Sequence, residues 1–252
     1  MKLLRFRDGK VEKKGAVVDG KVRRVQGSFF EEYVITEEEH SLDDIEFLPP
    51  VLPSKVVCVA RNYAAHAKEL GNEVPETPLI FLKPSTAVNS HEGVVEYPPS
   101  SSQVDYEGEL GVVIGKHCKN VKPEKAEEFI FGYTALNDFT ARDIQKEEGK
   151  FTRAKSFDTF APFGPFIETD MDWRSKRVQT RVNGETKQDG TTEQMIFDIP
   201  TLISFISEIM TLLPGDVIAT GTPPGVGAVQ DGDVVEVEVE GIGVLRNHVR
   251  KG

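Results

Sequence analysis

Short strand-like segments separated by turn residues make up most of this chain, and they constrain its fold more than any other feature. The run "KVVCVA" (55–60) is continuously apolar, as in a strand buried on both faces, and "DVVEVEVEG" (233–241) alternates valine with glutamate. One clear helix is expected over 198–216, where apolar residues recur at helical spacing between Pro200 and Pro214-Gly215. Many strands with few helices between them predict a mostly β or α+β fold rather than a regular βαβ repeat. Further strands are expected at 109–115, 131–138, 162–169 and 177–185.

A domain boundary is expected near residue 53, because "LPPVLP" (48–53) can continue neither a helix nor a central strand. Before it, "MKLLRF" (1–6) and "GAVVDGKVRRV" (15–25) favour short strands, with Asp19-Gly20 as a hairpin turn. The chain is therefore predicted to hold a small N-terminal β unit over 1–53 and a larger domain over 54–252.

The charge and cysteine content of the chain argue against several kinds of function. The formal net charge of −11 repels phosphate backbones, so nucleic acid is not an expected partner. Cys58 and Cys118 lie in apolar runs and are expected to stay reduced, since a core of this size needs no disulfide. No run is long and apolar enough to cross a bilayer, and the start "MKLLRFRDGK" lacks the apolar stretch of a secretory signal. A cytoplasmic protein that is not bound to a membrane is expected.

Two stretches place glutamates two residues apart on expected strands, and only one of them has a simple explanation. In 233–241 the intervening valines form an apolar face and the glutamates a solvated one. In "DYEGELGVVIG" (105–115) the face of Glu107 and Glu109 continues through Gly111 and Val113, which are small and apolar. Two carboxylates on such a face repel each other unless a proton or a cation lies between them. A hard divalent cation is one interpretation, and a chance Glu-x-Glu in an acidic chain is the other.

Asp138 is a candidate for a third carboxylate ligand. It follows the apolar strand segment "FGYTAL" (131–136), and functional groups often project where a strand ends. If a helical turn begins there, Arg142 and Gln145 share a face with Asp138 at spacings of four and seven residues. The alternative is that Asp138 only caps this turn and that Arg142 pairs with a surface acid. Both interpretations stay open on these residues alone.

A pair of residues suited to proton transfer is expected on a short helix at "RNYAAHAKELG" (61–71), which Asn62 can cap and Gly71 can end. His66 and Glu69 are three residues apart and therefore neighbours on one side of that helix. The carboxylate can accept a hydrogen bond from one imidazole nitrogen and fix its tautomer, which leaves the other nitrogen free to take a proton. The alternative is an ordinary surface contact between the two side chains.

Two further segments carry candidate binding groups. In "FTRAKSFDTF" (151–160), Lys155 lies among phenylalanines, where it can anchor an anion or have its pKa lowered by burial. The alternative for Lys155 is that its ammonium group reaches out to solvent. The loop "TGTPPGVG" (220–227) offers amides and hydroxyls to a carboxylate, but it lacks the spacing and the lysine of a nucleotide-binding loop.

In their order along the chain, these segments resemble the fumarylacetoacetate hydrolase family. The resemblance implies a catalytic domain built as a mixed β-sandwich-like roll, assembled as a homodimer. It also implies Mg²⁺, or Mn²⁺ or Ca²⁺ in its place, held by Glu107, Glu109 and Asp138. The matching blocks span nearly all of 54–249 and are "RNYAAHAKELG", "FLKPST", "DYEGELGVVIG", "GYTALNDFTARDIQ", "AKSFDTFAPFGPFI" and "LLPGDVIATGTPPGVG".

The same resemblance implies roles for the residues around that ion. The helix with His66 and Glu69 resembles a mobile lid whose two side chains handle water or protons. Residues 1–50 are shorter than the N-terminal domain of fumarylacetoacetate hydrolases proper, which favours the microbial branch with isomerase, decarboxylase and acylpyruvate hydrolase activities. The residues that match the substrate pocket of relatives are Arg142, Gln145, Lys155 and Thr222, and Lys155 is also a candidate catalytic group.

The sequence therefore predicts a Mg²⁺-dependent enzyme that acts on 2-oxo or enol dicarboxylic acids. Isomerisation or decarboxylation of the 2-hydroxyhepta-2,4-diene-1,7-dioate type, in the breakdown of aromatic compounds, is the first expectation. Acylpyruvate hydrolysis and decarboxylation or tautomerisation of oxaloacetate are alternatives within the enzyme class. A β-rich domain that binds small molecules without catalysis is the alternative from another class.

Overall fold

The computed structural model describes residues 1–251 and consists mostly of β-strands, as the sequence predicts. The largest sheet has twelve strands, and ten of them follow one another in the order β4-β3-β2-β1-β14-β12-β11-β17-β6-β7. Two short strands join it at the side, since β5 (Glu46–Leu48) pairs with β1 and β8 (Val88–Asn89) pairs with β14. The ten strands are β4 (Tyr33–His40), β3 (Lys21–Gly27), β2 (Val11–Val18), β1 (Lys2–Asp8), β14 (Ala161–Glu168), β12 (Ile130–Asn137), β11 (Gly108–Ile114), β17 (Val217–Ala219), β6 (Lys55–Ala60) and β7 (Leu79–Pro84).

Two smaller sheets complete the β structure of the described chain. One has five strands in the order β16-β15-β19-β20-β9, and the other has three in the order β13-β10-β18. The predicted mostly β architecture with few helices is confirmed. The strands of the smaller sheets are β16 (Glu185–Thr191), β15 (Arg177–Val182), β19 (Val234–Val239), β20 (Gly243–Lys251), β9 (Val94–Tyr97), β13 (Thr140–Ala141), β10 (Val104–Tyr106) and β18 (Gly227–Ala228).

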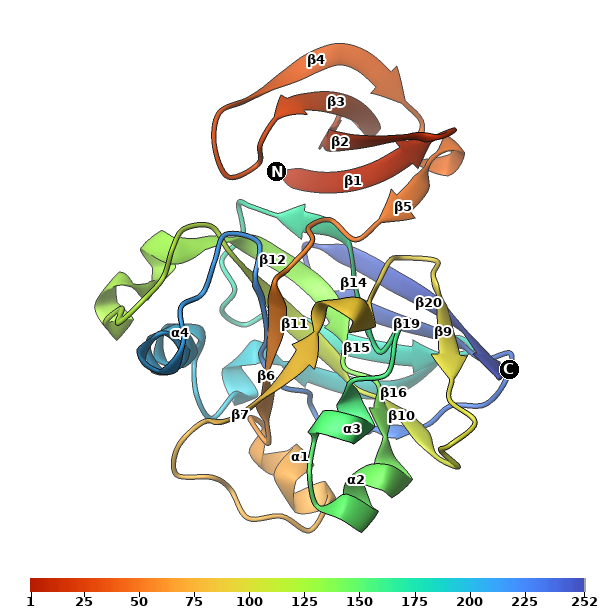
Figure 1. Ribbon diagram of the computed structural model, residues 1–252, viewed down its shortest axis with the longest axis vertical. Coiled ribbons are helices and arrows are strands. Elements are labelled where there is room, and N and C mark those ends of the chain that lie inside the picture. The colour runs from red at the N-terminus through yellow and green to blue at the C-terminus, as the bar shows by residue number, and fades with distance from the viewer. Residues whose placement is uncertain (252) are drawn as a thin grey trace.

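The N-terminal strands form a meander at one end of the molecule, drawn in red and orange in Figure 1. Asp19 and Gly20 join β2 to β3 with φ angles of 51° and 79°, which confirms the predicted hairpin turn. Strand β1 also pairs antiparallel with β14, through Leu3 opposite Ile167. The N-terminal strands therefore extend the main sheet, and the division of the chain at residue 53 stays a prediction.

The one long helix of the described chain, α4 (Ile199–Ile209), begins as predicted but ends earlier. Asp198 caps it by accepting a hydrogen bond from the Thr201 N–H, and Pro200 lies in the first turn. The expected end at Pro214-Gly215 is wrong, because the backbone becomes extended at Met210. Backbone hydrogen bonds of 2.9 Å in both directions then join Leu212 to Cys118, so tertiary pairing rather than proline ends the helix.

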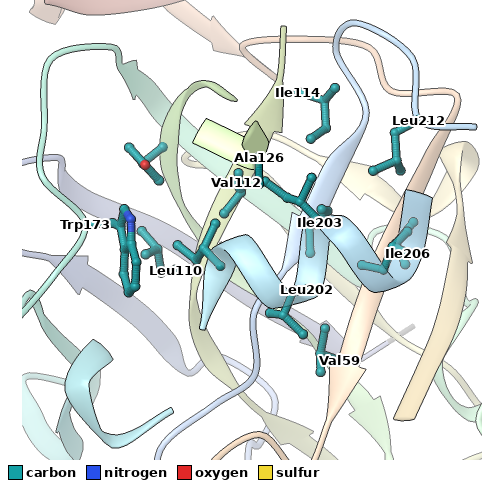
Figure 2. Close-up of a cluster of buried hydrophobic side chains, with 14 of the residues drawn as sticks. Val59, Leu110, Val112, Ile114, Ala126, Trp173, Leu202, Ile203, Ile206 and Leu212 are labelled. Atoms are coloured by element: carbon teal, nitrogen blue, oxygen red, sulfur yellow. The ribbon is translucent and has the colours of Figure 1, made fainter. Parts of the chain in front are cut away.

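Helix α4 covers one face of strand β11 and encloses the main hydrophobic core. Figure 2 shows Leu202, Ile203 and Ile206 of the helix in one cluster with Leu110 and Val112 of the strand, and all five side chains are fully buried. Because side chains alternate along a strand, Glu109 and Gly111 point to the opposite face of β11. The core thus holds in place the strand that carries the candidate acidic site.

Three short helices, α1 (Ala64–Glu69), α2 (Arg142–Glu148) and α3 (Thr152–Lys155), lie at the end of the molecule away from β1–β4 (Figure 1). Gly71 follows α1 with a φ of 70°, as predicted. The predicted cap by Asn62 is wrong, because Tyr63 is the N-cap residue and no side chain caps the helix. The Asn62 amide instead hydrogen-bonds the backbone of Phe197 and the carbonyl of Thr220.

The remaining helical turns are 3₁₀ helices that connect the strands. None of the helices in residues 1–251 is long and apolar enough to cross a membrane. The 3₁₀ turns are η1 (Leu42–Asp44), η2 (Ser85–Ala87), η3 (Pro123–Phe129) and η4 (Thr192–Gln194).

Candidate metal centre and active site

Three buried carboxylates meet where β10, β11 and β12 adjoin. Glu107 lies between β10 and β11, Glu109 lies in β11, and Asp138 directly follows β12. Pairing of β11 with β12 sets Gly108 opposite Asn137, and the Asp138 N–H donates to the Glu107 carbonyl at 2.8 Å. One carboxylate oxygen from each of the three side chains lies within 4.8 Å of the others. The structure thus brings together the three residues that the sequence singled out.

Gly108 lets the backbone between the two glutamates pack closely against the five-stranded sheet. A Cβ atom at this position would lie 2.0 Å from Thr180 Oγ1 in β15. The Gly108 N–H donates to Gln188 Oε1 at 2.9 Å, and the Glu107 N–H donates to Asn137 Oδ1 at 2.9 Å. The carboxylates of Glu107 and Glu109 therefore project from a backbone that hydrogen bonds hold in place.

Lys155 lies between two of the three carboxylates. Its Nζ donates to Glu107 Oε2 and to Asp138 Oδ2, both at 2.7 Å, and the side chain is buried. The alternative in which this lysine reaches solvent is therefore wrong. Burial alone lowers the pKa of Lys155, but the charges of Asp138 and Glu107 outweigh it and raise the pKa above its usual value. The interpretation in which burial lowers the pKa of Lys155 is therefore wrong.

The alternative role of Asp138 as a helix cap is also wrong. Helix α2 begins only at Arg142, with Ala141 as its N-cap residue and no side-chain cap. Arg142 does not pair with a surface acid either, because its guanidinium donates to the buried carboxylates of Asp105, at 2.8 Å, and Glu107. Burial alone lowers the pKa of Arg142, but these carboxylates raise it, so the guanidinium stays charged.

Glu107 and Glu109 have opposite electrostatic surroundings. Burial alone raises the pKa of Glu107, but Lys155 and Arg142 outweigh it and hold this pKa well below its usual range. Glu109 forms no ion pair within residues 1–251, and one of its oxygens accepts a hydrogen bond of 2.8 Å from the Gly221 N–H. Burial, with Asp138 and Glu107 close by, raises the pKa of Glu109 well above its usual value. The cluster therefore lacks one positive charge beside Glu109.

This donor set fits a hard divalent cation. Three buried carboxylates that share one small volume offer the oxygen ligands that Mg²⁺, Mn²⁺ and Ca²⁺ prefer. Glu109 is the carboxylate whose charge is not compensated, and a cation at this position would compensate it.

The glutamates of 233–241 differ from this cluster, as predicted. The valines of β19 at positions 235, 237 and 239 are buried, while Glu236 and Glu238 lie on the other face. Arg181 pairs with Glu236 at 3.0 Å and with Glu238 at 2.6 Å, and Arg246 also pairs with Glu236. This stretch is an amphipathic strand whose carboxylates are compensated by arginines.

The acidic cluster opens into a cavity of about 300 Å³. One face of β11 packs in the hydrophobic core, and the opposite face, which carries Glu109, borders this cavity. The wall includes every predicted site residue except Glu69. It also includes Phe81 and Phe151, whose rings stack beside Lys155 with centroids 4.7 Å apart. The predicted site residues on this wall are His66, Glu107, Glu109, Asp138, Arg142, Gln145, Lys155 and Thr222.

His66 and Glu69 are in contact on helix α1, as the sequence predicts. His66 is buried and its Nδ1 lies 3.3 Å from Glu69 Oε2, which leaves Nε2 without a hydrogen-bond partner among the described residues. Glu69 also accepts a hydrogen bond of 3.0 Å from the Gly225 N–H. This second bond ties α1 to the loop 220–227 and orients the carboxylate toward the imidazole.

The loop 220–227 does bind carboxylates through its amides, but these carboxylates belong to the protein. Gly221 holds Glu109 and Gly225 holds Glu69. The Thr222 hydroxyl donates to the Gly108 carbonyl at 2.8 Å and accepts from Gln188 Nε2 at 2.7 Å. Thr222 therefore braces the wall beside the glutamates, and its contact with a substrate stays a prediction.

A family model matches most of the chain. The model described as fumarylacetoacetate (FAA) hydrolase C-terminal matches residues 55–250. The chain belongs to the fumarylacetoacetate hydrolase family. A second model, described as Rv2993c-like, N-terminal, matches residues 1–50 of this family member.

Relatives within the family include several kinds of enzyme. Oxaloacetate tautomerase YisK of Bacillus subtilis is 42% identical over 225 residues, which cover 83% of this chain and 75% of that protein. The crystal structure of 2-hydroxyhepta-2,4-diene-1,7-dioate isomerase from Mycobacterium marinum matches with a TM-score of 0.92 and 41% identity, over 100% of this chain and 98% of that one. Fumarylpyruvate hydrolase from Pseudomonas aeruginosa, in complex with Mn²⁺ and pyruvate, matches with a TM-score of 0.75 and 33% identity, over 86% and 93% of the two chains.

One charged residue of this fumarylacetoacetate hydrolase family site, Lys83, was not singled out from the sequence. It lies in β7 and is fully buried. Its ammonium group donates to the Asp138 carboxylate and to the carbonyls of Phe139, at 3.0 Å, and Phe160, at 2.7 Å. The signal that could have found it is a lysine within the apolar segment "LIFLKP" (79–84), where a solvent-facing position is not expected.

Proposed function

We propose that this chain is a divalent-metal-dependent enzyme that moves a proton between the keto and enol forms of a 2-oxo dicarboxylic acid. Isomerisation of the 2-hydroxyhepta-2,4-diene-1,7-dioate type is the reaction we put first. The observation that carries the proposal is that the acidic cluster and the imidazole of His66 share the wall of one cavity. A group that polarises a 2-oxo acid and a group that takes a proton are thereby available to one small molecule.

Glu107, Glu109 and Asp138 would hold the metal ion, and Mg²⁺ is our first choice, with Mn²⁺ or Ca²⁺ as substitutes. When bound, such an ion supplies a Lewis acid that polarises the 2-oxo group and lowers the cost of an enolate. The Mn²⁺ and pyruvate named for the fumarylpyruvate hydrolase relative support this choice of ligands.

The charge balance of the buried cluster suits an anionic substrate. By formal charges, with every carboxylate ionised, a divalent cation changes the balance of the buried groups from one net negative charge to one net positive charge. This favours entry of a carboxylate into a protein that is otherwise acidic. The buried carboxylates are Asp105, Glu107, Glu109 and Asp138, and the buried cations are Lys83, Arg142 and Lys155.

His66 is the proposed proton-transfer group. Its Nε2 is free, while Glu69 holds Nδ1 and thereby fixes the tautomer in which Nε2 accepts a proton. The carboxylate of Glu69 also stabilises the imidazolium that forms, as in other base and carboxylate pairs. Lys155 and Arg142 keep Glu107 ionised and would orient the substrate carboxylate together with Gln145.

Tautomerisation of oxaloacetate is the second candidate, and the 42% identity to oxaloacetate tautomerase YisK favours it. It uses the same proton transfer on a shorter dicarboxylic acid. Acylpyruvate hydrolysis and decarboxylation use the same enolate but differ in whether the closed cavity admits a water molecule, so the assay distinguishes them by product.

The experiment is an assay of purified protein with Mg²⁺ against 2-hydroxyhepta-2,4-diene-1,7-dioate, oxaloacetate and an acylpyruvate. We expect Mg²⁺-dependent ultraviolet changes of keto–enol conversion without release of CO₂ or a cleaved acid. Release of either product would assign the protein to decarboxylation or hydrolysis instead. Oxalate, which resembles the enolate of a 2-oxo acid, should raise the melting temperature only with the metal present. A non-catalytic domain would show neither response.

We also propose a homodimer in the cytoplasm. Strand β7 ends the main sheet, and the exposed apolar side chains of Val74, Leu79 and Leu82 lie on it or just before it. Both cysteines are free and buried, which suits a reducing compartment. Light scattering after gel filtration tests the dimer, and a molar mass of one chain would contradict it.

A further inference from the structure

The mouth of the cavity carries cations that the acidic cluster does not use. Arg61, Lys146 and Lys150 line the cavity, and no ion pair to any of the three is found within residues 1–251. In a chain with a net charge of −11, three unpaired cations around one opening are a local reversal of the overall field. They would attract a second negative charge of a ligand.

Arg61 differs from the two lysines in how firmly it is held. Lys146 and Lys150 are exposed on and just after α2, whereas Arg61 is half-buried directly after β6, which pairs with β17 and β7 inside the main sheet. Its φ of 58° is uncommon for a residue with a side chain. The next residue, Asn62, anchors this backbone through three hydrogen bonds to Phe197 and Thr220. The backbone from which the Arg61 side chain projects is therefore held in place.

The two buried cations of the wall already form ion pairs. Arg142 and Lys155 pair with buried carboxylates of the cluster. Arg61 is thus the guanidinium on this wall that forms no ion pair within residues 1–251. A guanidinium presents two parallel N–H groups that match a carboxylate, and such a pair gives direction as well as affinity.

We propose that Arg61 binds the distal carboxylate of the substrate and so selects dicarboxylic over monocarboxylic 2-oxo acids. This inference rests on the proposed function, because it assumes that the 2-oxo end of the substrate binds at Glu107, Glu109 and Asp138. Lys146 and Lys150 add to the attraction at the mouth but, being exposed, contribute less to the choice between ligands.

The test compares two ligands that differ only in the distal carboxylate, 2-oxoglutarate and 2-oxopentanoate. Their affinities for the full chain loaded with Mn²⁺ are measured by calorimetry, with oxalate as a third ligand that has no distal group. Arg61→Asn removes the guanidinium with a residue that tolerates the left-handed backbone. We expect it to weaken 2-oxoglutarate binding by about 10- to 100-fold, the range for a charged hydrogen-bonded pair, and to leave 2-oxopentanoate and oxalate unchanged.

Lys68→Asn is the matched control, because Lys68 is exposed on α1 and does not line the cavity. It should change none of the three affinities by more than about twofold, as expected for a screened surface charge. Arg61→Lys should restore part of the loss. Equal weakening of both oxo acids in Arg61→Asn, or no preference for 2-oxoglutarate in the natural chain, would overturn the inference. Failure of the proposed function has a different signature, since the natural chain would then bind no oxalate in the presence of Mn²⁺.

Discussion

The ammonium group of Lys83 is fully buried against the carboxylate of Asp138, although their strands are not neighbours in the sheet. Lys83 comes from the edge strand β7, whereas Asp138 follows β12, and β11, β17 and β6 lie between them. This pair therefore connects the edge of the main sheet to the acidic cluster. Two carbonyls complete the hydrogen bonding of the ammonium group, so the buried charge has no unsatisfied donor.

Replacing Lys83 by methionine should strongly destabilise the protein. The variant leaves Asp138 buried with one partner fewer, and breaking a buried ion pair from one side costs about 3–5 kcal/mol. The free energy of unfolding, measured by urea denaturation in the absence of metal, checks this. Lys125→Met is the control, since Lys125 forms an exposed pair with Glu128 that is worth at most about 1 kcal/mol. Equal losses in the two variants would contradict the prediction.

Replacing Glu109 by glutamine should separate stability from metal binding. The natural side chain is a buried carboxylate without a cation partner, so a neutral amide of the same shape should leave the metal-free protein as stable or more stable. Affinity for Mn²⁺ should fall by at least about 100-fold, because even loss of a group that only orients a ligand costs 10- to 100-fold. Calorimetric titration with Mn²⁺ and thermal unfolding without metal measure the two effects.

Glu238→Gln is the control for that variant, because Glu238 lies on the solvated face of β19 and pairs with Arg181. It should alter neither quantity by a measurable amount. If Glu109→Gln retained its affinity for Mn²⁺, the assignment of the metal to the acidic cluster would be wrong.

Local rules were sufficient to make the three acids candidates, but only the resemblance to the family joined them into one predicted metal site. Alternation along β11 puts Glu107 and Glu109 on one face, and a polar residue after the apolar strand β12 projects at its end. The same local rules predicted the mostly β fold and the contact between His66 and Glu69, which depends only on helical spacing.

Features that depend on distant parts of the chain were not predicted. Lys83 reaches Asp138 across 55 residues of sequence, and no local pattern indicates that partner. Helix α4 ends at Ile209 because Leu212 pairs with Cys118, and Asn62 is used for loop contacts instead of a helix cap. A lowered pKa was one interpretation of Lys155 because its apolar surroundings were visible in the sequence, whereas its two carboxylate partners were not.

Metal affinity should rise with pH through the titration of Glu109. In the metal-free protein the pKa of Glu109 is raised well above its unfolded value by burial and by Asp138 and Glu107. Its protonated form therefore favours folding below the unfolded pKa, and this contribution is lost as pH rises through the folded pKa. Metal-free protein should lose stability over that interval. A divalent cation binds only the ionised form, so its affinity should rise by up to about tenfold per pH unit.

Thermal unfolding with and without Mn²⁺ between about pH 5 and pH 8 measures both trends. The stabilisation by Mn²⁺ should grow with pH in the natural chain. In Glu109→Gln the decline in metal-free stability that comes from ionisation of residue 109 should be absent. An identical pH dependence of metal-free stability in the natural chain and in Glu109→Gln over this interval would contradict the raised pKa.

Replacing His66 by alanine should reduce turnover without removing the metal. The imidazole lines the cavity, and Glu69 holds its Nδ1, so Nε2 is the group placed to transfer a proton. Loss of a positioned general base lowers kcat by about 10²- to 10⁴-fold, whereas the three carboxylates that bind Mn²⁺ stay in place.

Glu69→Gln should cause a smaller loss of kcat, because it changes the tautomer and the charge of the pair but keeps the imidazole. His117→Ala, at an exposed position outside the cavity, should leave both quantities unchanged. Rates of keto–enol conversion and calorimetric titration with Mn²⁺, made on the same samples, measure turnover and metal affinity. A His66→Ala variant that lost its affinity for Mn²⁺ would show a structural role for His66 instead.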